Sequence, residues 1–407
     1  MPHCVVSFME TRGQSTTFRV MLGLFVCACA IQIHAALRWG HESWQLSEWL
    51  INYAGGFVRR GLLGSLVWWI SHWTGLPANL LAIGIAVVGF VWLLRWMWAH
   101  ASRDFPPVLV LSCIVMGIPA YQDSIVRKDC IGLLLMIAAC HLAPGGRPDW
   151  WKLLALNLLA GVAILVHEAF TFFALGALVV AARPGDDKFT FTRLCGRGLM
   201  LAPAYFVFLA TVVWHGDPAH AVAVNASWLP LWAVTNPGDP GVAVPAAAIN
   251  ALGWTTSKGL SLGIDLLTSG IYQPAAWAMV YAITFGLMVM FSGGSGGTQA
   301  KLKIAALLVQ QLVLISPLFL LGYDYGRWLF YWTGGTIILY TLGFRAAGPV
   351  ESLVARVWEM FRVDHWLPRV PARYWYLLCF GVPVCWNIAA FSIASPLGRL
   401  WSYLPPW

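Results

Sequence analysis

The chain has 407 residues, of which 59% are hydrophobic and only 10% are charged, and its mean hydropathy is +0.70. A soluble domain of ordinary composition has about 25% charged residues, because it needs a charged surface to stay dissolved. The composition therefore excludes a soluble enzyme, a secreted disulfide scaffold and a nucleic-acid-binding protein. It predicts an all-α protein, a polytopic transmembrane helical bundle that forms a single domain over residues 1–407.

Apolar runs recur along the whole chain, and several are close to the shortest length that can cross a bilayer. We expect about eleven spans, at residues 20–37, 79–98, 107–121, 130–144, 152–167, 168–183, 198–214, 276–292, 304–322, 328–344 and 375–395.

Two long loops and one basic segment connect these spans. The first loop, 38–78, contains an apolar stretch at 61–73, which we interpret as a juxtamembrane helix because a span there would reverse every later loop. The second loop, 215–275, is rich in Pro, Gly, Trp and Asn, and the basic segment at 346–374 has an amphipathic pattern. The two spans predicted within 152–183 leave only His167 and Glu168 for the turn between them, so a single long span is the alternative there.

The charges indicate an orientation. With the N-terminus inside, most Lys and Arg residues fall in the loops that would face the cytoplasm, as the positive-inside rule requires. This distribution accounts for the net charge of +8 without nucleic acid or any other partner besides membrane lipids. We expect a multi-pass protein of a bacterial inner membrane.

The sequence predicts no cofactor and no metal. The nine cysteines have no metal-ligand spacing, and most lie in apolar runs where a thiol behaves as a small hydrophobic group. Neither a Walker A motif nor a dinucleotide-binding glycine motif is present. Energy for any reaction must therefore come with the substrate or from an ion gradient.

Four groups of ionisable residues fall on the predicted outer face, next to apolar spans, where charges are costly and often functional. They are Glu42, Glu48, Arg59 and Arg60; Asp123, Arg127, Lys128 and Asp129; His167 and Glu168; and Asp324 and Arg327. Most of the turns that carry them are short, so we expect the four groups to converge near the bilayer surface.

The basic members suggest an anion site. Arg59 and Arg60 follow a Gly-Gly pair, and adjacent guanidinium groups suit a phosphate or pyrophosphate. Arg127 and Lys128 would hold an anionic substrate in the same way. The alternatives are arginines that anchor a helix to lipid headgroups and a solvated loop whose charges pair with one another.

The acidic members and the histidine suggest proton transfer. Asp123 or Asp129 would act as a base or orient a sugar hydroxyl, and His167 and Glu168 are acid–base candidates by their chemistry. Asp324 lies three residues before Arg327 among aromatic residues suited to stacking on sugar rings. The alternatives are a buried histidine with all its hydrogen bonds made, a glutamate paired with an arginine of another span, and an Asp–Arg pair that caps a helix.

This layout resembles the GT-C class of glycosyltransferases and the related O-antigen and exopolysaccharide polymerases. The stretch Gly-Gly-Phe-Val-Arg59-Arg60-Gly and the stretch Asp324-Tyr-Gly-Arg327 are also similar to membrane proteins of surface-polysaccharide loci. The resemblance implies transfer or polymerisation of a glycan from a donor linked to polyprenyl phosphate or pyrophosphate, at the periplasmic face. The implied partners are this lipid-linked donor and a glycan acceptor.

The resemblance also implies roles for residues. The metal-dependent members carry an acidic residue, usually Asp, early in the first outer loop, whereas this chain has only Glu42 and Glu48 there. It is closer to the metal-independent polymerases, in which arginines surround the pyrophosphate. Four arginines would bind that group, namely Arg59, Arg60, Arg127 and Arg327. The acceptor hydroxyl would be deprotonated by one of four residues, namely Glu168, His167, Asp123 or Asp324.

Two other functions fit the same residues. A transporter or flippase of a lipid-linked or anionic solute would also need charges within the membrane domain, although the chain lacks inverted repeats. A non-enzymatic scaffold that binds polysaccharide-assembly proteins would tolerate single charge substitutions.

Overall fold

The computed structural model describes residues 3–39, 44–121, 125–143, 149–183, 190–235, 244, 246–269, 274–292, 297–322 and 324–363. These residues form helices and connecting turns, and within these ranges there is no β-strand, only one isolated antiparallel bridge between Ala182 and Arg345. The all-helical fold expected from composition is confirmed for this part of the chain. The predicted span at 375–395 and the second half of the basic segment lie outside the described residues.

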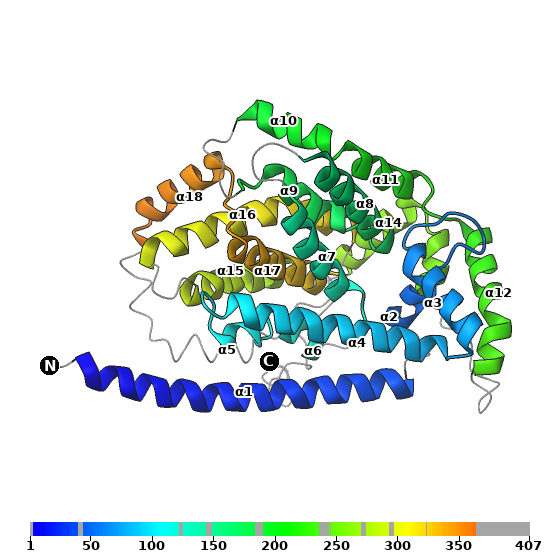
Figure 1. Ribbon diagram of the computed structural model, residues 1–407, viewed down its shortest axis with the longest axis horizontal. Helices are drawn as coiled ribbons and strands as arrows, with labels where there is room; N and C mark the ends of the chain where they lie inside the picture. The colour runs from blue at the N-terminus through cyan, green and yellow to red at the C-terminus, as the bar shows by residue number, and fades with distance from the viewer. Residues whose placement is uncertain are drawn as a thin grey trace.

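The elements follow one another along the chain with short connections (Figure 1). They are α1 (His3–Trp39), α2 (Trp44–Trp49), α3 (Gly61–Thr74), α4 (Ala78–Trp96), the π-helix η2 (Met97–Ala101), α5 (Pro107–Val110), α6 (Gly117–Tyr121), α7 (Asp129–Leu142), α8 (Trp150–Val166), the π-helix η3 (Thr171–Leu175), α9 (Gly176–Val180), α10 (Phe191–Met200), α11 (Ala202–Val213), α12 (Pro218–Thr235), α13 (Ala247–Asn250), the 3₁₀-helix η4 (Ala251–Gly253), α14 (Thr256–Thr268), α15 (Pro274–Phe291), α16 (Gly297–Leu321), α17 (Tyr325–Thr341) and α18 (Gly348–Met360).

Three helices within the described ranges are long and apolar enough to cross a membrane, namely Phe18–Arg38, Ala78–Ala101 and Gly297–Leu321. A fourth crossing results if α10 and α11, which meet at a bend of 63°, act as one broken span. Figure 1 shows α1 along one edge of the molecule with α4 beside it. These apolar helices are compatible with a membrane protein.

The predicted span at 107–121 is not a continuous helix. The structure has the two short helices α5 and α6 there, separated by turns. Pro106 and Pro107 start α5, and a Cβ on Gly117 would lie 2.5 Å from the Ser112 carbonyl oxygen, so the chain turns back on itself at this glycine. All residues from Val108 to Tyr121 are buried, which explains why the stretch is apolar without being one long helix.

Helix α17 forms the centre of the bundle, and every residue from Gly326 to Leu339 is buried. Its polar groups are bonded to neighbouring helices and turns: Trp332 Nε1 donates to the Leu308 carbonyl at 2.7 Å, and Thr333 Oγ1 donates to the Ile114 carbonyl at 2.8 Å. The ring of Tyr331 stacks on Phe173 at 4.1 Å. These contacts hold α17, whose first turn carries Arg327, in place within the bundle.

The two long loops pack against each other at one end of the bundle, where Figure 1 shows α12 beside α3. The fully buried Trp228 of α12 donates from Nε1 to the Leu50 carbonyl at 2.7 Å, and Asn52 Nδ2 donates to Ser227 Oγ at 2.9 Å. The backbone N–H of Ala248 donates to Ser47 Oγ at 2.9 Å. The second loop therefore holds the short helix α2 and the turn after it in place.

The outward faces of several helices carry large apolar side chains, as a surface in contact with lipid does. On α4, α8 and α11 the exposed residues include Val88, Val91, Trp92, Leu158, Phe206, Val212 and Val213. The helix expected at 61–73 is present as α3, with Trp69 and Trp73 exposed. In the described half of the basic segment, α18 buries Val354 and Trp358 and exposes Leu353 and Met360.

Candidate functional site

The N-termini of three helices meet at one buried cluster of charged residues. Arg60 immediately precedes α3, Lys128 immediately precedes α7 and Asp324 immediately precedes α17. Contacts connect the three ends: Lys128 Nζ donates to the Arg60 carbonyl at 3.2 Å, and Arg127 Nη1 lies 3.5 Å from Asp324 Oδ2. Because a helix N-terminus carries a partial positive charge, the backbone adds to the positive field of the basic side chains.

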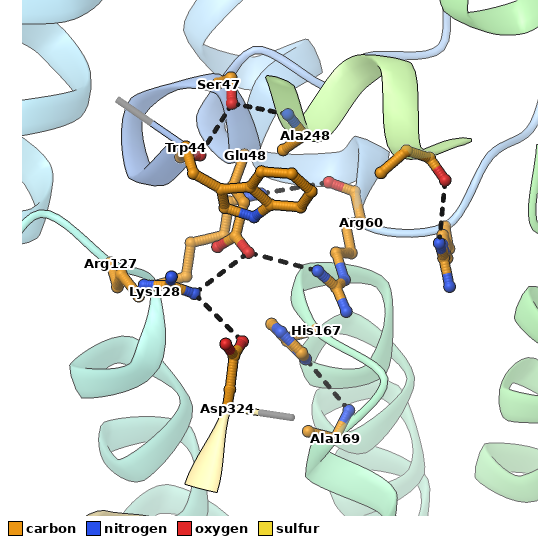
Figure 2. Close-up of polar contacts among 12 residues, drawn as sticks. Trp44, Ser47, Glu48, Arg60, Arg127, Lys128, His167, Ala169, Ala248 and Asp324 are labelled. Carbon is orange, nitrogen blue, oxygen red and sulfur yellow. Dashed lines mark hydrogen bonds and ion pairs between the residues drawn. The ribbon is translucent and has the colours of Figure 1, made fainter. Parts of the chain in front are cut away.

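Glu48 of α2 lies at the centre of this cluster (Figure 2). Its Oε1 is 3.3 Å from Arg60 Nη1, 3.4 Å from Arg327 Nη1 and 3.5 Å from Arg127 Nη1. Burial alone would raise the pKa of Glu48, but the three guanidinium groups outweigh burial and hold this pKa well below its ordinary value. Glu48 is therefore a carboxylate that brings three arginines together.

Arg60 links the first loop to the turn after α8. Its Nε and Nη2 both donate to the carboxylate of Glu168, with the shortest distance 2.5 Å between Nη2 and Oε1. The backbone of Arg60 has φ +62°, a left-handed conformation that costs a non-glycine residue about 1 kcal/mol or more. This conformation turns the chain into α3 and points the guanidinium group at both Glu48 and Glu168.

Arg327 and Asp129 form a fully buried ion pair of the cluster. Arg327 Nε donates to Asp129 Oδ1 at 2.6 Å, and the hydroxyl of Tyr331 donates to the same oxygen. Arg327 Nη1 also lies 3.5 Å from Asp324 Oδ2. Asp324 therefore pairs with Arg127 and Arg327 together, rather than with Arg327 alone.

Lys128 is buried among the basic residues. Its only described polar contact is the Arg60 carbonyl, and its Nζ lies 5.7 Å from the centroid of the Trp49 ring. Burial, with Arg60 and Arg327, lowers the pKa of Lys128 to about 7, against the opposing effect of Glu48 and Glu168. Its ammonium group is therefore easier to deprotonate than that of an ordinary lysine.

His167 ends α8 in an extended conformation, with its imidazole inside the cluster (Figure 2). Its Nδ1 accepts a hydrogen bond from the backbone N–H of Ala169 at 3.1 Å. An acceptor nitrogen bears no hydrogen, so the proton of the neutral ring is on Nε2. Nε2 is buried and has no hydrogen-bond partner among the described residues.

Other buried polar atoms of the cluster also lack a partner among the described residues. They are Glu48 Oε2, Asp129 Oδ2 and Arg327 Nη2. Buried polar atoms are usually bonded to protein or ordered water, so several unpartnered atoms in one cluster indicate a place for water or a polar ligand. In the described ranges, no three His, Cys, Asp or Glu side chains are grouped so that they could hold a metal ion.

The structure brings together the described members of the four groups singled out in the sequence, with one partial exception. Arg59 points its Nη2 at the Ala251 carbonyl of η4, at 3.3 Å, and so contacts the second loop. Asp123 and Glu42 lie outside the described residues.

Two members of the cluster had no role assigned from the sequence. Glu48 had no recognisable context, because its partners are 12, 79 and 279 residues away along the chain. Tyr331 lies in an apolar stretch and was not singled out. Its spacing of four residues from Arg327 places both on one face of α17, and this spacing is the sequence signal that could have found it.

The chain matches no protein-family model, no curated protein and no solved structure.

The arrangement is suited to binding an anion. Arg60, Arg127 and Arg327 meet at Glu48, next to the N-termini of α3, α7 and α17. Two N–H donors of the cluster, on Arg327 Nη2 and His167 Nε2, have no acceptor in the described part of the chain. Such donors bind phosphate groups through charge-assisted hydrogen bonds. The carboxylates keep the arginines in position when no ligand is bound.

Proposed function

We propose that this protein is an integral membrane glycosyltransferase or polysaccharide polymerase of surface polysaccharide biosynthesis. Its donor is a sugar linked to polyprenyl phosphate or pyrophosphate, used at the periplasmic face of a bacterial inner membrane that the chain crosses several times. The observation that carries the proposal is the convergence of Arg60, Arg127 and Arg327 at Glu48 in one cluster, beside the N-termini of α3, α7 and α17.

The chemistry of glycosyl transfer explains why such a cluster is useful. When the bond between the anomeric carbon and the phosphate oxygen breaks, negative charge develops on the departing phosphate. Arginines fixed in a site that excludes water stabilise this charge without having to reorganise. Arg60, Arg127 and Arg327 are already fixed by Glu48, so they supply this stabilisation to the leaving group.

The layout of the molecule agrees with a lipid-linked donor. The cluster lies beside the first loop, next to α3, whose exposed Trp69 and Trp73 suit the boundary between lipid and water. In this proposal the polyprenyl tail stays in the bilayer beside α3 and the pyrophosphate binds among the arginines.

The profile of lipid-linked saccharides and surface glycan in a deletion strain tests the proposal. The strain is complemented with wild type, Arg127→Gln or Arg345→Gln, the last a matched control at an exposed ion pair with Glu351. We expect a lipid-linked unit to accumulate and long chains to disappear in the deletion and in Arg127→Gln, at equal protein levels, and the Arg345→Gln profile to be normal.

Two results would count against the proposal. An unchanged glycan profile in the deletion strain excludes a role in polysaccharide synthesis. Accumulation of the lipid-linked saccharide on the cytoplasmic side of the membrane instead identifies the protein as a flippase or transporter.

A further inference from the structure

Transfer to a hydroxyl needs a group that takes the hydroxyl proton, and the carboxylates of the cluster are poorly suited to this role. Each of them is bound to at least one arginine: Glu48, Asp129, Glu168 and Asp324. A carboxylate that is neutralised by a guanidinium group is a weaker base than a free one. These four side chains are better explained as the frame that positions the arginines.

The imidazole of His167 is also poorly placed to accept a proton. The lone pair of its Nδ1 is used by the N–H of Ala169, at 3.1 Å, and the other nitrogen, Nε2, already carries the ring proton. Nε2 is the nitrogen without a partner among the described residues. His167 therefore presents an N–H donor to the cluster, suited to an oxygen of the substrate.

Lys128 differs from these residues because no carboxylate of the described chain lies within ion-pair distance of its Nζ. Its side chain is only 1% exposed, and its amine makes one hydrogen bond, to the Arg60 carbonyl. A neutral amine keeps this bond through one N–H and still has a free lone pair. The charged groups around it from the packed elements are Glu48 of α2, Arg60 before α3, Glu168 after α8 and Arg327 of α17.

We propose that Lys128, as the neutral amine, is the general base that deprotonates the acceptor hydroxyl, and that His167 Nε2–H is a hydrogen-bond donor to the substrate. This inference rests on the proposed function and assigns a catalytic role at the same site. The hydroxyl O–H bond breaks and its proton goes to Lys128 Nζ, while the oxygen forms a bond to the anomeric carbon. The bond from that carbon to the phosphate oxygen breaks, and its electron pair leaves with the pyrophosphate.

The acid–base properties of Lys128 agree with this geometry. Burial lowers its pKa to about 7, so that near neutral pH a large fraction of the amine is unprotonated. An ordinary lysine, with a pKa of about 10.4, would be almost fully protonated and unable to act as a base.

The test uses the purified full-length protein in lipid nanodiscs, with the lipid-linked saccharide that accumulates in the deletion strain as donor and acceptor. Transfer is measured between pH 5.5 and 9 for wild type, Lys128→Arg and Lys128→Met, and binding of farnesyl pyrophosphate is measured in parallel. In wild type we expect transfer to rise with pH and level off above about pH 7. In Lys128→Arg we expect binding to be kept, transfer to fall by roughly 100-fold or more, and the residual rate to lose this pH dependence.

A second measurement is independent of transfer and of whether the variants fold. Competitive acetylation of wild-type protein across the same pH range, read by mass spectrometry, titrates the Lys128 amine directly. A pKa near 7 is expected, and a value near 10 would overturn the inference.

The outcomes separate the inference from the proposed function. A wild type that neither binds farnesyl pyrophosphate nor transfers the saccharide refutes the proposed function, and the base assignment with it. A wild type that transfers while Lys128→Arg keeps both its rate and its pH profile refutes only the assignment of Lys128.

Discussion

At the scale of single residues, Arg327 binds three carboxylates of the cluster. It is buried and contacts the carboxylates of Asp129, Glu48 and Asp324 at 2.6, 3.4 and 3.5 Å. A buried ion pair gains little over an apolar pair, but removal of one partner leaves the other charge buried and unpaired. Arg327 therefore matters for stability as well as for any ligand.

Arg327→Ala should lower the free energy of unfolding by about 3–5 kcal/mol, because Asp129 would be left without its guanidinium partner. Thermal unfolding in detergent checks this. The matched control is Arg345→Ala, at the exposed pair with Glu351, which should cost no more than about 1 kcal/mol. Equal losses in the two variants would contradict the account of Arg327.

Lys128 should give the folded protein a pH-dependent stability above neutral pH. Because its pKa is about 7 when folded and close to 10.4 when unfolded, the unfolded chain binds more protons between these values. Stability should therefore rise with pH in this window, by at most about 1.4 kcal/mol per pH unit. Unfolding of wild type and Lys128→Met, measured from pH 7 to 9.5, should show this rise in wild type only; parallel curves would contradict it.

The sequence was informative about which residues meet and less so about how they pair. Charged residues beside apolar spans are costly, so their convergence on one site followed from composition and topology. The pairs themselves join positions far apart along the chain: Arg60 binds Glu168 across 108 residues, and Asp129 binds Arg327 across 198. No local spacing encodes such pairs. The nearby pair Asp324–Arg327 could be predicted from its spacing, but the second partner of Asp324, Arg127, could not, because it is far away along the chain.

At the scale of elements, the position of α3 depends on one close backbone contact. A Cβ on Gly64 would lie 1.8 Å from the Ile51 carbonyl oxygen and 2.8 Å from the Trp49 carbonyl oxygen. These atoms are backbone and cannot rotate away, so only glycine lets α3 lie against the end of α2. Because Glu48 is the residue before Trp49, and Arg60 immediately precedes α3, this contact sets the geometry of the cluster.

Gly64→Ala should therefore destabilise the protein and abolish binding of farnesyl pyrophosphate, since α3 must move away from α2. The control is Gly84→Ala in α4, where an added Cβ meets nothing within 4 Å and should be neutral or stabilising by up to about 1 kcal/mol. Unfolding and binding of the two variants check the prediction. A Gly64→Ala protein as stable and as active in binding as Gly84→Ala would show that the contact is unimportant.

The helices could be predicted where the pattern was long and uninterrupted, as in α4 and α16. The prediction was wrong at 107–121, where burial on all sides made two short helices and their turns as apolar as one span. The stretch after His167 likewise contains a π-helix and the short helix α9 rather than one regular helix. Apolar composition reports burial, and it does not distinguish lipid from protein surroundings.

At the scale of the whole molecule, the proposed orientation can be tested with exposed positions on opposite sides. Lys258 of α14 belongs to the second long loop, which we place outside, and the native Cys195 of α10 lies in a basic region that we place inside. Two single-cysteine proteins are compared: Lys258→Cys in a background without other cysteines, and a protein that carries only Cys195. In intact cells, a membrane-impermeant maleimide should label the first protein and leave the second unlabelled. After permeabilisation both should be labelled, and the reverse pattern would invert the topology.

The central claim is that the arginine cluster binds the pyrophosphate of a polyprenyl-linked donor. The most direct test is the affinity of the purified protein for farnesyl pyrophosphate and for farnesol, measured by titration calorimetry for wild type, Arg127→Gln and Arg345→Gln. We predict that wild type and Arg345→Gln bind the pyrophosphate at least about tenfold more tightly than the alcohol, and that Arg127→Gln loses most of this difference. Equal affinities of wild type for the two compounds would contradict the claim.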